Sequence, residues 1–89
     1  MQEKQLTIIN KLGLHARAAA KLINVTSQFS CDIRLNKEGR TVDGKSIMSV
    51  MMLAASKGTQ LLVTTDGEDE NKALLAIETL INNRFDEEE

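Results

Sequence analysis

The sequence contains no proline, tryptophan or tyrosine, and it has a single cysteine, a single histidine and only two phenylalanines. Because one cysteine cannot form an internal disulfide, we expect an apolar core to hold the fold and a reducing, cytoplasmic location. One histidine and one cysteine do not form a metal-ligand set, so we expect no metal and no other cofactor. Two aromatic side chains are also too few for a platform on which nucleic-acid bases stack.

The charge and hydropathy of the chain exclude further classes. The net charge at pH 7 is −2 and no cluster of Lys and Arg stands out, so nucleic-acid binding is not expected. No apolar run approaches the ~20 residues of a membrane span, and the first residues lack the pattern of a signal peptide. Apolar residues make up 42% of the sequence, which predicts one packed domain over residues 1–89 without membrane insertion.

Alternating apolar residues predict four strands. The expected strand segments are residues 6–9, 31–36, 40–43 and 61–65. In the first of them, Leu6 and Ile8 fall on the same face. The second and third are joined by a tight turn around Gly39, so they must be antiparallel.

Apolar residues recur at helical spacing in three segments of the chain. The predicted helices are residues 16–27, 47–54 and 70–83. Ser46 is a good N-cap for the second helix, and Glu68 or Asp69 can cap the third. The element order is then βαββαβα, which predicts an α+β fold with three helices over a mostly antiparallel sheet.

The only histidine, His15, lies between the first predicted strand and the first predicted helix. Gly13 allows the backbone to turn there. The free N–H groups and the dipole of a helix start favour an anion, and Arg17 adds a planar cation. This combination suits a histidine that accepts, holds and passes on a phosphoryl group, although a lone histidine near a helix start is often only a polar surface residue.

The second predicted helix is unusually apolar for a helix with one exposed face, since seven of the eight residues 47–54 are apolar. The side expected to pack against the sheet consists of Ile47, Val50, Leu53 and Ala54. The residues left over are Met48, Met51 and Met52. Either the helix is buried on most sides, or the methionines form an adaptable docking patch.

Three smaller expectations concern the rest of the chain. Cys31 fits a strand pattern, which favours a small buried side chain over a nucleophile. Phe85 is expected to fold back onto the core. The acidic residues 86–89 that follow are most simply a solubilising, frayed end.

Two motifs at a characteristic separation carry a family resemblance. Residues 13–17, Gly-Leu-His-Ala-Arg, and residues 44–50, Gly-Lys-Ser-Ile-Met-Ser-Val, resemble the two signatures of the HPr family, the histidine-containing phosphocarriers of the bacterial phosphoenolpyruvate-dependent phosphotransferase system. Similar residues at 57–59, 66–67 and 69–73 extend the resemblance over nearly the whole chain. It implies an open-faced β-sandwich with strand order 1-4-2-3.

The resemblance also implies roles for particular residues and partners. His15 would take a phosphoryl group on Nδ1 from enzyme I and give it to enzyme IIA proteins, with Arg17 steadying the charge. Ser46 would be a regulatory site for HPr kinase. The docking face for these partners would comprise Ala16, Ala20, Ile47, Met48, Met51 and Met52. We expect a monomer that turns over as a carrier and is not an autonomous enzyme.

One residue departs from the usual family pattern, and the acidic end leaves open which subgroup of the family the chain resembles. Most family members have proline where this chain has Ala18, and the freer unfolded chain predicts a loss of about 0.4–1 kcal/mol in stability with the chemistry intact. The acidic end resembles the nitrogen-type relative, NPr. Sugar uptake and nitrogen control are therefore both open.

Two functions of other classes compete with the carrier. A small hydrolase of the acylphosphatase kind would need a phosphate-cradling loop with an arginine and a water-orienting asparagine, and the sequence shows no such pattern. A purely regulatory binding module would have no use for the chemistry of His15 and Arg17, and the presence of both residues argues against it.

Overall fold

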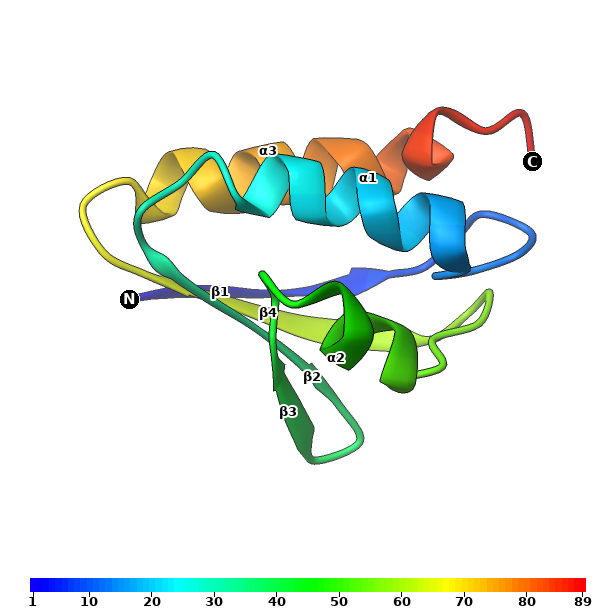
Figure 1. Cartoon of the computed structure of the whole chain (residues 1–89), viewed down its shortest axis with the longest axis horizontal. Coiled ribbons are helices and arrows are strands. Elements are labelled where there is room, and N and C mark those ends of the chain that lie inside the picture. The colour runs from blue at the N-terminus through cyan, green and yellow to red at the C-terminus, as the bar shows by residue number, and fades with distance from the viewer.

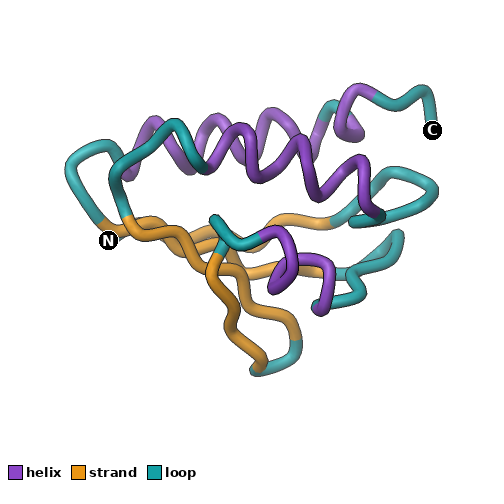
Figure 2. The backbone as a smooth tube through the Cα atoms, in the orientation of Figure 1, coloured by secondary structure: helices purple, strands orange, loops and turns teal.

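The computed structural model describes all residues, 1–89, and shows three helices packed on a four-stranded sheet (Figures 1 and 2). The elements in chain order are β1 (Gln2–Thr7), α1 (Ala16–Thr26), β2 (Asp32–Lys37), β3 (Arg40–Asp43), α2 (Ile47–Met52), β4 (Gln60–Asp66), α3 (Glu70–Asn82) and a short helical turn, Arg84–Asp86. This confirms the predicted order βαββαβα. None of the helices has the length and apolar character needed to cross a membrane.

The strands are arranged in the order β1-β4-β2-β3, and every neighbouring pair is antiparallel. α1 and α3 lie side by side over the sheet, and α2 contacts both α1 and β3 (Figure 1). The fold is therefore an open-faced β-sandwich, and the strand order implied by the family resemblance is confirmed.

The core lies between the sheet and the helices, and the alternating strand pattern decides which side chains enter it. Leu61, Val63 and Thr65 of β4 are buried, while the residues between them point to the other face. Burial of Cys31 and Phe85 confirms both expectations for those side chains. Removing such apolar surface from water provides about 25 cal/mol for each Å² and is the main favourable term in folding.

Most element boundaries agree with the expectation to within one residue, and larger differences occur in β1, which covers residues 2–7 where 6–9 was expected, and at the end of α2. β1 begins at Gln2 because the polar residues 2–5 pair with residues 62–65 of β4. These four residues show no alternation of apolar and polar side chains, so the sequence pattern does not reveal that they form a strand. α2 ends at Met52 because Ala54 adopts a positive φ of 52°. As a result Ala54 is exposed and Ala55 is buried in its place, so the expected packing of Ala54 against the sheet is wrong.

Asp69 occupies the N-cap position of α3, but its side chain makes no hydrogen bond to the N–H groups of that helix, so the expected capping is wrong. The Asp69 carboxylate accepts hydrogen bonds from the backbone N–H groups of Ser30 and Cys31, both at 2.9 Å. It thus ties the start of α3 to the chain entering β2. These bonds, with the Ser30 N–H as the largest cause, hold the pKa of Asp69 below its ordinary value.

The loop after β1 is fixed to the segment that leads into β4. Leu14 N–H donates to the carbonyl of Ala55 at 2.8 Å, and Gly58 N–H donates to the carbonyl of Ile8 at 2.7 Å. Gly13 has φ +67°, and a Cβ at this position would lie 2.4 Å from the Ala55 oxygen. Glycine is therefore required at residue 13 both for its conformation and for the close approach of the two backbones.

We predict that Gly13→Ala destabilises the protein by well over the ~1 kcal/mol expected for a left-handed alanine alone, because the new Cβ also displaces the Ala55 backbone. Gly39→Ala is the matched control, since Gly39 has φ +86° with no atom within 4 Å of its Cβ position. Urea unfolding of the two variants gives the comparison. Equal losses would show that the close approach at Ala55 has no energetic consequence.

Candidate functional site

His15 is the residue that immediately precedes α1. Its backbone is extended, with φ −74° and ψ 177°, and its carbonyl accepts the first helical hydrogen bond from Ala19 at 2.8 Å. The imidazole makes no capping bond to the helix and its side chain is 28% exposed. The N–H groups of Ala16, Arg17 and Ala18 precede the first helical donor, so they belong to the set that a helix leaves without internal partners.

Three cationic side chains surround the histidine. Lys11, Arg17 and Lys21 line an open hollow of about 550 Å³ together with His15 and the acidic residues 86–89. Arg17 is exposed and makes no hydrogen bond or ion pair. Its guanidinium is therefore unengaged in the hollow that the imidazole also lines, as a group that receives a phosphoryl anion should be.

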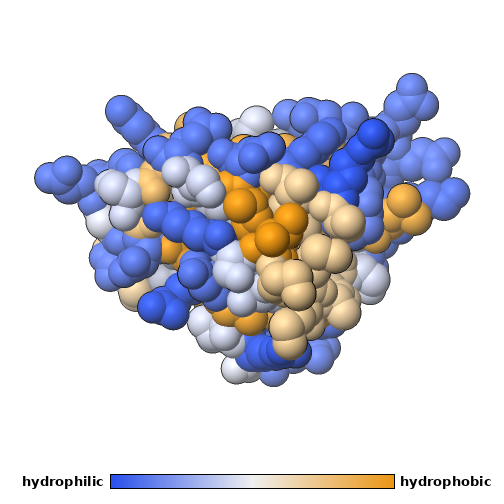
Figure 3. Space-filling view, in the orientation of Figure 1, coloured by the Kyte–Doolittle hydropathy of each residue, from blue (hydrophilic) through white to orange (hydrophobic).

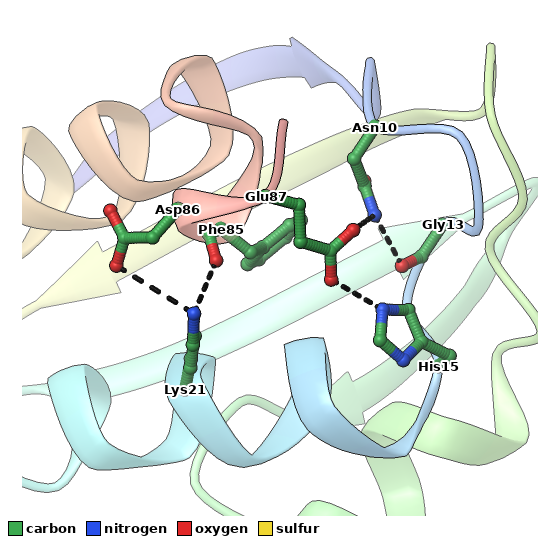
Figure 4. A network of polar contacts seen from close by, with 7 residues as sticks. All are labelled: Asn10, Gly13, His15, Lys21, Phe85, Asp86 and Glu87. Carbon is green, nitrogen blue, oxygen red and sulfur yellow. Dashed lines mark hydrogen bonds and ion pairs between the residues drawn. The ribbon is translucent and has the colours of Figure 1, made fainter. Parts of the chain in front are cut away.

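The acidic C-terminal segment contacts the site, and the expectation of a frayed end is wrong. Glu87 Oε2 lies 2.5 Å from His15 Nε2, and Glu87 Oε1 accepts a hydrogen bond of 3.1 Å from Asn10 (Figure 4). Lys11 bonds Glu89 through its backbone N–H and by an ion pair of 3.2 Å. The four acidic residues thus line the hollow together with its three cations.

A short turn directs this segment toward the histidine. Arg84, Phe85 and Asp86 all have positive φ, between 54° and 62°. Such conformations are unfavourable for residues other than glycine, so tertiary contacts must hold them. The Phe85 side chain is fully buried in the core, and Lys21 donates a hydrogen bond of 2.7 Å to the Phe85 carbonyl (Figure 4).

The carboxyl group of Glu87 is stabilised in its charged form. Burial by itself would raise the pKa of Glu87, but the hydrogen bonds from Asn10 and His15 outweigh it, and the pKa lies below its ordinary value. Glu87 is therefore ionised near neutral pH.

The methionines of α2 form an exposed apolar patch. Met48 is 68% exposed and Met52 is 59% exposed, whereas Val50 between them is fully buried. This excludes a helix that is buried on most sides. Ile47 is exposed as well, so its expected packing against the sheet is wrong, and it joins the same surface as Met51.

This surface is continuous with the start of α1. Apolar side chains gather over α2 and the neighbouring end of α1, with hydrophilic side chains around them (Figure 3). Ala16 is exposed and Ala20 is half-buried on α1, which contacts α2. We call the surface of Ala16, Ala20, Ile47, Met48, Met51 and Met52 the methionine patch.

Ser46 caps α2 as the sequence indicates. Its hydroxyl accepts a hydrogen bond of 3.3 Å from the backbone N–H of Ser49, and the side chain is half-buried. A capping role and a modification site are compatible, because a phosphate on this oxygen would stay at the helix start.

Sequence reasoning missed several residues near His15, among them Lys11, which lines the hollow. Leu12 is 66% exposed at the rim of the hollow, and Lys21 lines it. Asn10 and Glu87 reach the site from opposite ends of the chain. The acidic residues 86–89 gave a signal of charge, but no local pattern shows that a C-terminal segment returns to the loop after the first strand.

Cys31 takes no part in this site, and burial raises the pKa of its thiol. No group of three or more His, Cys, Asp or Glu side chains is placed to hold a metal ion. The candidate chemistry therefore rests on the imidazole, the guanidinium, the helix start and the surrounding charges.

The chain resembles known proteins in both sequence and structure. A family model described as the PTS HPr component phosphorylation site matches residues 2–83. The phosphocarrier protein HPr of Pseudomonas aeruginosa is 58% identical over the full length of both chains. The crystal structure of HPr-C-His from Thermoanaerobacter tengcongensis superposes with a TM-score of 0.97 at 40% identity, covering 100% of both chains. A crystal structure of an HPr dimer from the same organism matches with a TM-score of 0.79, also at 40% identity, covering 98% of this chain and 100% of that one.

We predict that Glu87→Gln lowers the free energy of unfolding by about 1 kcal/mol near neutral pH, since hydrogen bonds to a charged group are lost. A group whose pKa is lowered by folding stabilises the fold above its unfolded pKa, about 4.3 for glutamate. That contribution disappears as the pH falls through the folded pKa.

Urea unfolding across the acidic range is the measurement, and the two proteins should converge in stability at low pH. Glu88→Gln is the control, because Glu88 is exposed and makes no hydrogen bond or ion pair. A stability difference for Glu87→Gln that does not vary with pH would contradict the prediction.

Proposed function

Because the chain belongs to the HPr family, the phosphocarrier proteins of the phosphotransferase system, we propose that His15 is the residue that carries the phosphoryl group. The observation that supports this most strongly is the placement of a partly exposed imidazole at the start of α1, in the same hollow as the unengaged Arg17. The donor in this proposal is enzyme I and the acceptors are enzyme IIA proteins.

The chemistry needs one nitrogen with a free lone pair. The lone pair of His15 attacks phosphorus, the bond from phosphorus to the donor group of enzyme I breaks, and a P–N bond forms. The negative charge of the phosphoryl oxygens then meets the first N–H groups of α1 and the Arg17 guanidinium. Transfer to the next protein is the reverse exchange, and it depends mainly on positioning.

The methionine patch supports a proposal for partner binding. It lies against the start of α1, so a protein that docks on it reaches His15. Flexible methionine side chains adapt to more than one partner, as a carrier between a donor and several acceptors requires. We expect a brief encounter of a monomer through a modest interface, in the reducing cytoplasm that the unpaired Cys31 suits.

Ser46 is proposed as the regulatory site, phosphorylated by HPr kinase. Its hydroxyl lies at the start of α2, directly before Ile47 of the methionine patch. A phosphate would add ~2 negative charges at the edge of this apolar surface. The modification should therefore weaken docking while leaving His15 itself unchanged.

We predict that incubation with enzyme I and phosphoenolpyruvate adds one acid-labile phosphoryl group to the protein, and that His15→Ala abolishes it. Arg17→Gln should slow the transfer by about tenfold or more, since it removes a charged donor next to the phosphoryl oxygens. Intact-mass spectrometry before and after acid treatment measures the label. No label on the wild-type protein, with enzyme I active on another carrier, would refute the carrier function and favour a regulatory module.

We predict that Met48→Glu reduces the efficiency of phosphoryl transfer from enzyme I by about tenfold, mainly through a higher KM, because it places a charge in the methionine patch. Leu75→Glu is a matched control, since Leu75 is 63% exposed on α3. Ser46→Asp should act in the same direction as Met48→Glu. Equal effects of the Met48 and Leu75 substitutions would place the docking surface elsewhere.

A further inference from the structure

We propose that Glu87 is a positioning residue for phosphoryl transfer, which holds the proton of the His15 ring on Nε2 and so leaves the Nδ1 lone pair free to attack phosphorus. This inference rests on the carrier function proposed above. It assigns a task to the acidic C-terminal segment, which lines the hollow beside His15.

The hydrogen-bonding capacity of the Glu87 carboxylate and the His15 imidazole determines which ring nitrogen carries the proton. A carboxylate can only accept hydrogen bonds, and a neutral imidazole donates through one nitrogen and accepts at the other. Glu87 Oε2 lies 2.5 Å from His15 Nε2, which is closer than in an ordinary N–H···O hydrogen bond, and the ionised carboxylate can only accept a proton from this nitrogen. Nε2 is therefore the nitrogen that keeps a proton, and in the neutral form of the ring Nδ1 holds the free lone pair.

The orientation of the ring determines from which side a phosphoryl group approaches. The other ring nitrogen is turned away from Glu87 (Figure 4). An incoming phosphoryl group thus approaches on the side of the ring that is remote from the carboxylate, where the like charges repel each other least. No proton has to leave the ring when the P–N bond forms.

The same contact favours the phosphorylated state. As the Nδ1 lone pair is shared with phosphorus, the ring acquires positive charge while Nε2 keeps its proton. The Glu87 carboxylate faces that charge directly at Nε2. A carboxylate that orients an imidazole and stabilises its charged form serves the same purpose in other histidine sites.

Asn10 fixes the position of Glu87. It is fully buried, and its Nδ2 donates to the Gly13 carbonyl at 2.8 Å and to Glu87 Oε1 at 3.1 Å (Figure 4). Its Oδ1 has no partner. Rotating the amide by half a turn would place this oxygen against two acceptors, so the two donated bonds determine the orientation.

The path of the chain to Glu87 is also held in place. Phe85, two residues before Glu87, is buried, and Lys21 of α1 donates a hydrogen bond to the Phe85 carbonyl. Such contacts offset the cost of the left-handed conformation of the three residues in the turn. The carboxylate is therefore delivered to Nε2 by an anchored segment, through contacts that also involve α1.

The test compares Glu87→Ala with Glu88→Ala, the matched control one residue further along. In the unphosphorylated wild-type protein we expect nitrogen-resolved NMR to show a hydrogen-bonded Nε2 proton that exchanges slowly with water. This signal should be lost in Glu87→Ala and kept in Glu88→Ala. Single-turnover transfer from enzyme I should slow by about tenfold in Glu87→Ala alone, because an orienting partner is removed.

The outcomes separate this inference from the proposed function. A wild-type protein that takes no phosphoryl group refutes the carrier function, whereas the NMR signal is measured without enzyme I. If transfer occurs and Glu87→Ala is as fast as the wild type, or faster because the segment only blocks access, the positioning role is overturned. Absence of the protected Nε2 proton in the wild type overturns it as well. Amide NMR spectra of Glu87→Ala report whether the fold is retained.

Discussion

The site depends on the backbone contact between the loop after β1 and the segment that leads into β4. Gly13 approaches the Ala55 carbonyl so closely that no side chain fits between them, and Leu14 donates a hydrogen bond to the same oxygen. This contact fixes where the chain begins α1 and the direction in which it enters the helix. His15 follows at once, so the packing of two backbones fixes where its Cα lies, and Glu87 then contacts its ring.

Three segments that are distant in the sequence meet at that point. The loop contributes Asn10, the start of α1 contributes His15 with Arg17, and the C-terminal segment contributes Glu87. The arrangement balances opposite requirements. In the proposed carrier, cations and helix N–H groups would attract the phosphoryl anion, while the carboxylate on Nε2 would keep the other ring nitrogen free to react. A group held between such charges can be accepted and released.

The sequence predicted those features that depend on a single residue type or on a regular spacing of apolar residues. Alternation predicted the buried faces of β2 and β4, and Ser46 was recognised as a cap from its type and place. The start of β1 was missed because residues 2–5 are polar and are defined only by pairing with β4. The role of Glu87 was missed for a similar reason. Its contact spans 72 residues and depends on a turn of three left-handed residues that no local preference indicates.

The resemblance to phosphocarriers supplied the strand order and the candidate roles, and the structure adds the environment in which those roles would be performed. The central claim is that the ring of His15 reacts through Nδ1 because Nε2 is engaged. Long-range proton–nitrogen correlation NMR of the phosphorylated protein tests it most directly, since coupling to phosphorus identifies the bonded nitrogen. We expect phosphorus on Nδ1 and a proton on Nε2, and phosphorus on Nε2 would contradict the claim.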